Sequence, residues 1–242
     1  VWREGGAGEG RVGVGVEALV VERTAQGNVG EIRVGNDKER GNPFFNKLQT
    51  DFLKDMEKAG WPRDSVDTVL CTHLHVDHVG WNTMLVDGKW VPTFPKARYL
   101  IGKREWDFWS TEDDEDNAPV LADSVQPIFD AGLADLVSDD HVVCDEVRLR
   151  PTPGHTPGHV SIVISSKGET AIITGDLMHH PCQMAKTDWR SAFDSDGDMA
   201  EKTRHAFLAE MADADTLVIG THFATPAAGH VKRDGAGYRL EV

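Results

Sequence analysis

The sequence predicts an α/β fold built from layers of strands and helices, in a single domain that spans residues 1–242. Short β-branched and apolar runs, typical of buried strands, occur in both halves of the chain, and helical patterns lie between them. A chain of 242 residues can bury a full core, and neither a linker nor a repeat of short fixed period divides this one. Strands and helices interspersed in this way are typical of layered α/β domains.

The first sixty residues predict one strand and one helix. Residues 12–21 alternate weakly between apolar and polar side chains, which predicts a strand, and residues 26–28 are expected to form a turn after it. From Asn42 onward, apolar side chains recur at the spacing of a helix face until Gly60. That stripe is typical of core packing, so a helix is expected over residues 42–60.

Two strands and a hairpin are expected in the next part of the chain. Residues 66–71 (VDTVLC) are mostly β-branched or apolar, as in a strand that is buried on both faces. A hairpin is expected at residues 90–95 and a further strand at residues 98–101. The strand at residues 66–71 leads directly into a cluster of histidines, which makes it the most informative of these elements.

An acidic and aromatic segment follows at residues 103–131, where helical patterns cover residues 104–109 and 119–131. This segment is expected to be a helical insertion, either a cap over a functional site or a plain solvated surface element. Its apolar side chains would line a substrate cleft or a subunit interface, and its acidic run at residues 112–116 would face water. The apolar side chains concerned are Trp106, Trp109, Val120 and Leu121.

The second half of the chain is rich in expected strands and contains one long helix. The strands are expected at residues 142–150, 160–165, 170–174, 216–220 and 238–242, and the helix at residues 199–212. Three aspartates before this helix resemble the start of a calcium-binding loop, but the sixth position of such a loop falls on Met199 instead of a glycine. A capped helix start therefore explains Asp194, Asp196 and Asp198 better.

Four side chains that can bind a metal ion follow the strand at residues 66–71. Imidazole and carboxylate are the groups that a borderline metal such as zinc binds. Loops at the carboxyl ends of strands are also where open α/β sheets place ligands. A loop that is rich in histidine by chance is the alternative, but four such side chains so close together favour a metal site. They are His73, His75, Asp77 and His78.

Three later strands lead into side chains of the same kind, in the sequences TPGHTPGH, GDLMHH and THF. One strand that ends in this way would be unremarkable by itself. Because four strands do so, we expect these side chains to gather along one rim of the fold as a single metal site. The later candidates are His155, His159, Asp176 and His222.

In this order and spacing, the candidate ligands resemble the metal-binding set of the metallo-β-lactamase superfamily. The resemblance covers roughly residues 42–230 and implies an αββα sandwich with two metal ions in a cleft between the sheet edges. It implies that one metal ion is held by His73, His75 and His155, that the other is held by Asp77, His78 and His222, and that Asp176 bridges both.

Two further histidines take their expected roles from the same resemblance. In TPGHTPGH the family uses the first histidine as the ligand, so His159 would lie behind the ligands and orient one of them. Lactonases of the family often carry a tyrosine three residues after the bridging aspartate. This chain has His179 there, which is expected to form a hydrogen bond with the substrate. The stretch EIRVGNDK replaces an Asp-Thr-Gly-like stretch of the family, so the early strands are expected to be distorted or shortened.

The donor set and the resemblance together predict a metal-dependent hydrolase. Two zinc ions per chain are expected, with manganese, cobalt or iron as alternatives. A hydroxide that bridges two such ions forms near neutral pH and can attack a carbonyl or phosphoryl group. Lactone or ester cleavage, similar to that of acyl-homoserine lactonases, is the leading expectation. Phosphotriester hydrolysis, β-lactamase activity and a non-catalytic metal-binding protein are the alternatives.

Composition and charge limit the partners. The net charge of −15 at pH 7 argues against nucleic acid and against an anionic membrane surface, so a small-molecule substrate is expected, with a homodimer as a further expectation. Three scattered cysteines do not suggest a disulfide framework, which favours the cytoplasm. The opening VWREGGAGEG does not resemble a signal peptide, but it lacks an initial Met, so trimming and secretion stay open.

Overall fold

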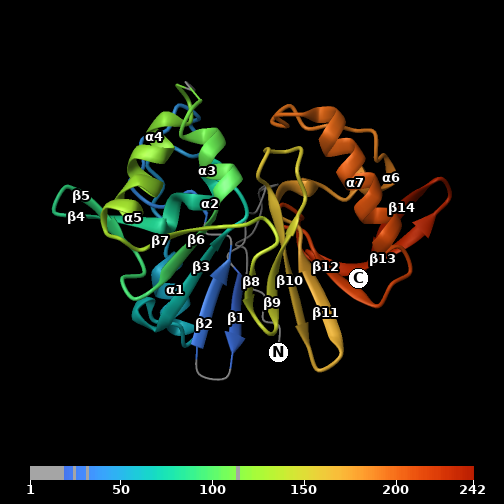
Figure 1. The fold of residues 1–242 in the computed structure, drawn as a ribbon, viewed down its shortest axis with the longest axis horizontal. Coiled ribbons are helices and arrows are strands. Elements are labelled where there is room, and N and C mark those ends of the chain that lie inside the picture. The colour runs from blue at the N-terminus through green and yellow to red at the C-terminus, as the bar shows by residue number, and fades with distance from the viewer. Residues whose placement is uncertain (1–18, 24–25, 31–32, 113–114) are drawn as a thin grey trace.

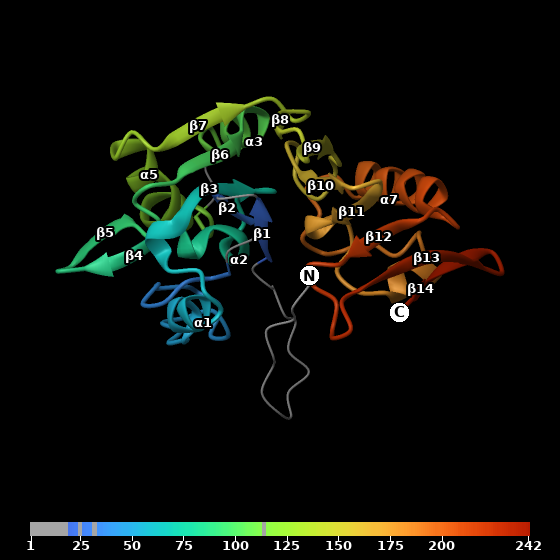
Figure 2. The same cartoon turned by 90° about the horizontal axis from the view of Figure 1, so that it is seen from below.

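Two β-sheets lie at the centre of the fold, and each is covered by its own set of helices (Figure 1). The computed structural model describes residues 19–23, 26–30, 33–112 and 115–242. The first sheet and its helices come from the N-terminal half, and the second sheet and its helices come from the C-terminal half (Figure 2). This arrangement confirms the expected α/β class and the αββα sandwich.

In the part of the chain that the structure describes, the first sheet contains five strands. In spatial order they are β1 (Leu19–Arg23), β2 (Gln26–Gly30), β3 (Val66–Cys71), β6 (Arg98–Gly102) and β7 (Ala134–Val137). All neighbours are parallel except β1 and β2, and the register between β2 and β3 shifts at Gly27 and Asn28, in keeping with the expected distortion of the early strands. The connections carry a hairpin of β4 (Thr83–Val86) and β5 (Lys89–Pro92), and helices α1 (Phe52–Lys58), α2 (Val76–Val79), α3 (Lys103–Trp109), α4 (Ala118–Val120) and α5 (Gln126–Asp130).

The second sheet contains seven strands. In spatial order they are β14 (Gly237–Glu241), β13 (Ala228–Asp234), β12 (Thr216–Ile219), β11 (Glu169–Ile173), β10 (Val160–Ser166), β9 (Val147–Pro151) and β8 (Val142–Cys144). Among the described strands of this sheet, β11 and β12 form the only parallel pair. A parallel pair needs a long crossover, and α6 (Cys182–Ala185) and α7 (Gly197–Met211) lie in that connection.

Three apolar clusters hold the four layers together. The alternation of side chains between the two faces of each strand explains how one strand contributes to two clusters. Leu70 of β3 and Leu100 of β6 join Ile162 of β10 in the cluster between the two sheets. Successive side chains of a strand point to opposite faces. Val69 therefore packs in the cluster between the first sheet and its helices, and Val163 packs in the cluster between the second sheet and α7.

The start of α7 is capped as the sequence predicts. The side chain of Asp196 accepts a hydrogen bond from the backbone N–H of Met199 at 2.9 Å. An aspartate at this position satisfies a backbone donor that the first turn of a helix leaves unpaired. The helix begins at Gly197, two residues earlier than predicted.

The segment at residues 103–131 packs its apolar face inward. Trp109 and Val120 are buried in the cluster beside the first sheet, and Trp106 and Leu121 pack against that cluster. The acidic residues of the run that the structure describes, which are Glu112, Glu115 and Asp116, are exposed as expected. Trp109 and Val120 therefore serve the core of the N-terminal half, whereas Trp106 and Leu121 stay partly exposed.

A proline explains the irregular helix in this segment. A π-helical turn (Leu121–Val125) lies between α4 and α5, and Pro127 lacks the N–H that would reach the carbonyl of Asp123. Two side chains from other parts of the chain donate hydrogen bonds to that carbonyl instead. The ammonium group of Lys38 donates to it at 3.0 Å, and the hydroxyl of Thr83 donates at 2.5 Å.

Some predicted boundaries in the N-terminal half are wrong. The helix expected over residues 42–60 is reduced to α1, because Lys47 has a positive φ of 49°, which is incompatible with a helix. The turn expected at residues 26–28 lies within β2. Of the strand expected at residues 12–21, only the last three residues are described, and they belong to β1.

Other differences concern turns and short strands. The hairpin lies at residues 83–92 instead of 90–95, because the Asp87-Gly88 pair supplies the two positive φ angles of a tight hairpin turn. The strand expected at residues 142–150 is divided into β8 and β9. The strands β7 and β13 were not predicted from the sequence, since neither has an apolar run longer than two residues. No helix in the described part of the chain is both long enough and apolar enough to cross a membrane.

Candidate metal centre

The loops that follow four strands bring the seven predicted ligands together. The loop after β3 and the adjoining helix α2 supply four of them, and the loop between β9 and β10 supplies one. A 3₁₀ turn (Gly175–Leu177) after β11 and the loop after β12 supply one each. The side chains that meet are His73, His75, Asp77, His78, His155, Asp176 and His222.

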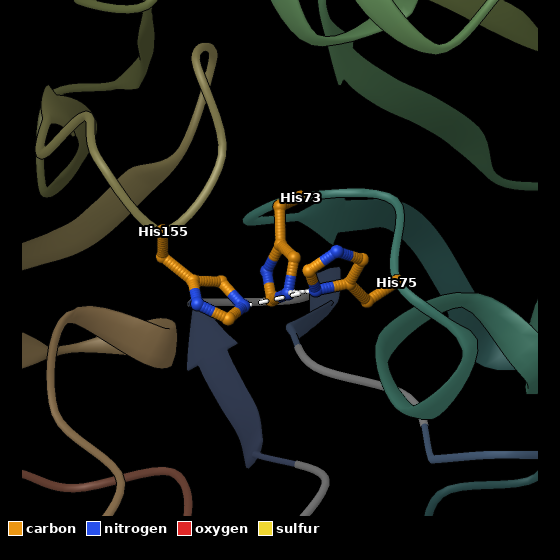
Figure 3. Close-up of side chains that lie close together, drawn as sticks. All are labelled: His73, His75 and His155. Atoms are coloured by element: carbon orange, nitrogen blue, oxygen red, sulfur yellow. Dashed lines mark hydrogen bonds between the residues drawn. The ribbon is translucent and has the colours of Figure 1, made fainter. Parts of the chain in front are cut away.

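Three imidazoles face one another in the first group of candidate ligands (Figure 3). The Nε2 atom of His73 lies 3.1 Å from Nδ1 of His75, which lies 2.9 Å from Nε2 of His155. Nitrogen atoms that share one tetrahedral zinc ion at about 2.0–2.1 Å are roughly 3.3 Å apart. The spacing of the three nitrogen atoms therefore fits a common cation with only small adjustments.

The second group contains one carboxylate and two imidazoles. The Nε2 atom of His78 lies 3.6 Å from one carboxylate oxygen of Asp77, and Nε2 of His222 lies 3.7 Å from the other. His78 and His222 are buried, and Asp77 is half-buried. This group offers one oxygen and two nitrogen ligands, which also suits a borderline divalent cation.

Asp176 lies between the two groups. Its Oδ1 atom is 3.0 Å from Nε2 of His78, and its Oδ2 atom is 3.0 Å from Nε2 of His222. The same Oδ2 atom is 3.3 Å from Nε2 of His155, which belongs to the first group. One carboxylate thus reaches both groups, as a bridging ligand must.

The electrostatics of the site suit a divalent cation. Burial holds the pKa of His73 and of His75 well below the ordinary value, so these imidazoles are neutral and can coordinate. Burial would raise the pKa of Asp176, but the electrostatic attraction of His78 and His222 outweighs the effect of burial. The pKa of Asp176 therefore lies well below its ordinary range. Burial would lower the pKa of His222, but the Asp176 carboxylate raises it. A buried carboxylate among imidazoles is a donor set that a cation satisfies.

His159 lies behind the ligand cluster and contacts the backbone of Asp176. Its Nε2 atom accepts a hydrogen bond from the Asp176 N–H at 2.8 Å, so Nδ1 carries the proton and donates to the Thr152 carbonyl at 3.0 Å. Burial lowers the pKa of His159 to about 3, which keeps the ring neutral. Gly175 makes this contact possible, because a Cβ atom there would lie 2.6 Å from Nε2 of His159.

Asp194 contacts a candidate ligand in a way that sequence reasoning missed. Its carboxylate lies 3.0 Å from Nδ1 of His155 and accepts a second hydrogen bond from the backbone N–H of Ser191 at 3.0 Å. The chain between Asp194 and Asp196 also runs alongside the His155 loop, with backbone hydrogen bonds at Ser195 and Asp196. The cluster of aspartates before α7 was the only sign of this contact in the sequence. Within that cluster Asp196 caps the helix, and Asp194 is the partner of the His155 imidazole.

His179 also reaches the cluster. Its Nε2 atom lies 3.2 Å from Oδ2 of Asp176, and its ring stacks on His222 with the ring centroids 5.2 Å apart. Its backbone N–H is fixed by the side-chain oxygen of Gln183 at 2.7 Å. The side chain of His179 is 23% exposed, against 5% or less for the imidazoles of His73, His78, His155 and His222, but both of its ring nitrogens are buried.

Comparisons with known proteins identify the family. The family model for the metallo-beta-lactamase superfamily matches residues 43–222 of this sequence. The probable metallo-hydrolase YybB of Bacillus subtilis is 28% identical over 137 residues, which are 52% of this chain and 56% of that protein. The chain spans about half the length of the curated relatives that it matches.

Two solved structures extend the similarity to nearly the whole fold. One is AidC, a dizinc quorum-quenching lactonase in complex with a product, with a TM-score of 0.74, 24% identity, and coverage of 93% of this chain and 78% of AidC. The other is the hydrolase AbOPH of the beta lactamase superfamily, with a TM-score of 0.75, 25% identity, and coverage of 92% and 77%. The chain belongs to the metallo-β-lactamase superfamily, which confirms the predicted resemblance.

Proposed function

We propose that the protein is a metal-dependent hydrolase that binds two divalent cations, most suitably zinc, and cleaves lactone or ester bonds. His73, His75 and His155 would hold one cation, and Asp77, His78 and His222 would hold the other. The position of Asp176 carries the proposal, because its carboxylate is within 3.3 Å of imidazole nitrogens from both groups. When bound, two such cations supply a hydroxide near neutral pH and polarise the oxygen of the bond under attack.

The side chains of this protein would prepare the site in three ways. Neutral imidazoles supply nitrogen ligands without competing protons. The hydrogen bonds of His159 to Asp176 and of Asp194 to His155 hold two candidate ligands in place. His179 is a half-buried imidazole at the edge of the cluster, and we propose that its ring donates a hydrogen bond to the substrate.

A neutral lactone or ester is the leading substrate class, as expected from the sequence. The fold is similar to that of the lactonase AidC, and at 24% identity this likeness concerns the fold alone. The net charge of −15 disfavours anionic substrates such as carboxylated β-lactams. A phosphotriester is the second candidate, because the same donor set can polarise a phosphoryl oxygen.

A substrate panel tests the proposal directly. The panel contains acyl-homoserine lactones, p-nitrophenyl esters, a phosphotriester and a β-lactam, each assayed with metal analysis of the same sample. We expect the highest kcat/KM on a lactone or an ester. A preference for the phosphotriester would favour the second candidate, and two bound cations without turnover of any compound would favour a non-catalytic metal-binding protein. The homodimer expected from the sequence is checked separately by the mass in solution.

A further inference from the structure

We propose that Glu105 is a positioning residue, whose carboxylate locks the loop of His73 and His75 to the loop of His155 and so fixes the first group of candidate ligands. This inference rests on the proposed function, since it assigns a role within the same metal site. Glu105 lies on α3, and its side chain is not a candidate ligand itself.

The Glu105 carboxylate is buried and accepts four hydrogen bonds. The residue is 1% exposed. Its Oε1 atom accepts from the backbone N–H of Leu74 at 3.1 Å and from Nε1–H of Trp109 at 2.7 Å. Its Oε2 atom accepts from the hydroxyl of Thr156 at 2.7 Å and from the backbone N–H of Gly158 at 3.0 Å. A carboxylate is an acceptor at both oxygens, so all four donors are matched.

The two carboxylate oxygens serve different parts of the chain. Leu74 lies between His73 and His75, so Oε1 holds the loop that follows β3. Thr156 directly follows His155, so Oε2 holds the loop between β9 and β10. These loops belong to different sheets, and Glu105 thus fixes the distance across which the imidazoles of His75 and His155 meet.

Trp109 provides a second route from Glu105 to a candidate ligand. Its indole N–H is held by Oε1 of Glu105, and its ring packs edge-on against the ring of His75, with the centroids 5.3 Å apart. Trp109 is 7% exposed and belongs to the core cluster beside the first sheet. A hydrogen bond to Glu105 therefore sets the orientation of a rigid surface behind the His75 imidazole.

The close approach of Gly158 to α3 is an independent sign that this junction is built to a fixed geometry. A Cβ atom at Gly158 would lie 2.3 Å from the backbone nitrogen of Glu105 and 2.6 Å from its Cα atom. No residue other than glycine fits there without a shift of the backbone. The TPGHTPGH loop thus packs closely against the start of α3, where the Glu105 carboxylate accepts hydrogen bonds from it.

The four donors around Glu105 suit a carboxylate that accepts at both oxygens. Burial raises the pKa of its carboxyl group, and the hydrogen bonds from Thr156, Leu74, Trp109 and Gly158 reduce that rise without cancelling it. An amide at this position keeps the size of the side chain but turns two acceptor sites into donors. Its NH₂ group would then face either the Leu74 N–H or the Gly158 N–H, neither of which can accept.

The test is Glu105→Gln, examined as the metal-loaded full chain. Cobalt is exchanged into the site, its visible absorption spectrum is recorded, and the affinity for each cation is measured by competition with a chelator. We expect a changed spectrum, a 10–100-fold loss of affinity for one of the two cations, and a larger change in kcat than in KM on the best substrate of the panel. The far-ultraviolet circular dichroism should stay that of the wild type.

Asp123→Asn is the matched control, because it alters an equally satisfied carboxylate that contacts Arg40 and lies outside the two loops. If the control changes the cation affinity as much as Glu105→Gln does, general destabilisation explains the effect and the inference is wrong. An unchanged spectrum and affinity in Glu105→Gln would also overturn it. Wild-type protein that binds no cation would instead refute the proposed function.

Two milder variants replace Glu105→Gln if that protein does not fold. Trp109→Phe removes the indole donor to Oε1 but keeps an aromatic ring beside His75, and Thr156→Val removes the hydroxyl donor to Oε2. Each should give a smaller change of the same kind in the cobalt spectrum and in the cation affinity. Two variants with wild-type values would contradict the proposed role of Glu105.

Discussion

The carboxylate of Asp194 lies 3.0 Å from Nδ1 of His155, on the opposite side of the imidazole from the candidate metal position at Nε2. A carboxylate in this position accepts a hydrogen bond from Nδ1–H of the imidazole, so that Nε2 carries no proton and is left free to coordinate. Asp194 is itself held by a hydrogen bond from the backbone N–H of Ser191. Burial would raise the pKa of the Asp194 carboxyl group, but the hydrogen bonds from His155 and Ser191 outweigh burial and lower this pKa. The orientation of one candidate ligand therefore depends on a residue from another loop.

Asp194→Asn should weaken the site without removing a ligand. The neutral amide holds the imidazole of His155 less firmly and stabilises its ligand form less, so a loss of about 10–100-fold in cation affinity or turnover is expected. Isothermal titration with zinc checks the affinity. Asp198→Asn is the control, since its side chain is 87% exposed and contacts Arg190. Equal effects of the two substitutions would refute the specific role of Asp194.

Asp176→Asn should reduce turnover by orders of magnitude while the fold survives. The amide is a poor cation ligand, and both groups of candidate ligands depend on this one side chain. Steady-state kinetics and circular dichroism measure the two parts of this prediction.

His159→Ala should have a smaller effect than His155→Ala. His159 touches the backbone N–H of Asp176 and would act through that residue, so a loss of roughly 10–100-fold in turnover is expected. The comparison uses kcat and metal content of both alanine variants. If the two losses are equal, the assignment of His155 as the ligand in TPGHTPGH is wrong.

His179→Phe should lower kcat/KM and leave the metal content unchanged. Phenylalanine keeps the ring that stacks on His222 but cannot donate a hydrogen bond to a substrate. The loss expected for one such hydrogen bond is about 10-fold. A loss of one cation per chain would show instead that His179 is a ligand, as its 3.2 Å distance to Asp176 would allow.

Lys38 should make the stability depend on pH. Its side chain is fully buried, and its pKa is lowered to about 8 by burial, which outweighs the attraction of Asp123. Between about pH 8 and 10.5 the unfolded chain keeps a proton that the folded chain has released, so the free energy of unfolding rises with pH. The rise is on the order of 3 kcal/mol over the whole window. Denaturant unfolding of the wild type and of Lys38→Met checks it, and a difference between the two that stays constant with pH would contradict it.

The ligands were predictable because short apolar runs mark the strands that precede them. His73, Asp176 and His222 each follow within three residues of a strand that the sequence predicts, and strand ends gather at one rim. Lys38 and Glu105 were not predictable in this way. Each depends on partners far along the chain, and a charged residue in sequence gives no sign that it will be buried.

The limits of the fold prediction have similar causes. Local turn chemistry at Asp87-Gly88 displaced the predicted hairpin, and the positive φ of Lys47 shortened the predicted helix. The face of Trp109 and Val120 was expected at a cleft or an interface, but long-range packing places it in the core. Periodicity identifies an apolar face, whereas its partner is set by the tertiary fold.

Metal content in active protein is the most direct measurement of the central claim. The purified chain should contain about two divalent cations, because seven candidate ligands are more than one four-coordinate zinc can use. A chelator should abolish hydrolysis, and zinc, cobalt or manganese should restore it, with activity returning as the second equivalent is added. Fully active protein with one cation or none per chain would contradict the two-cation site.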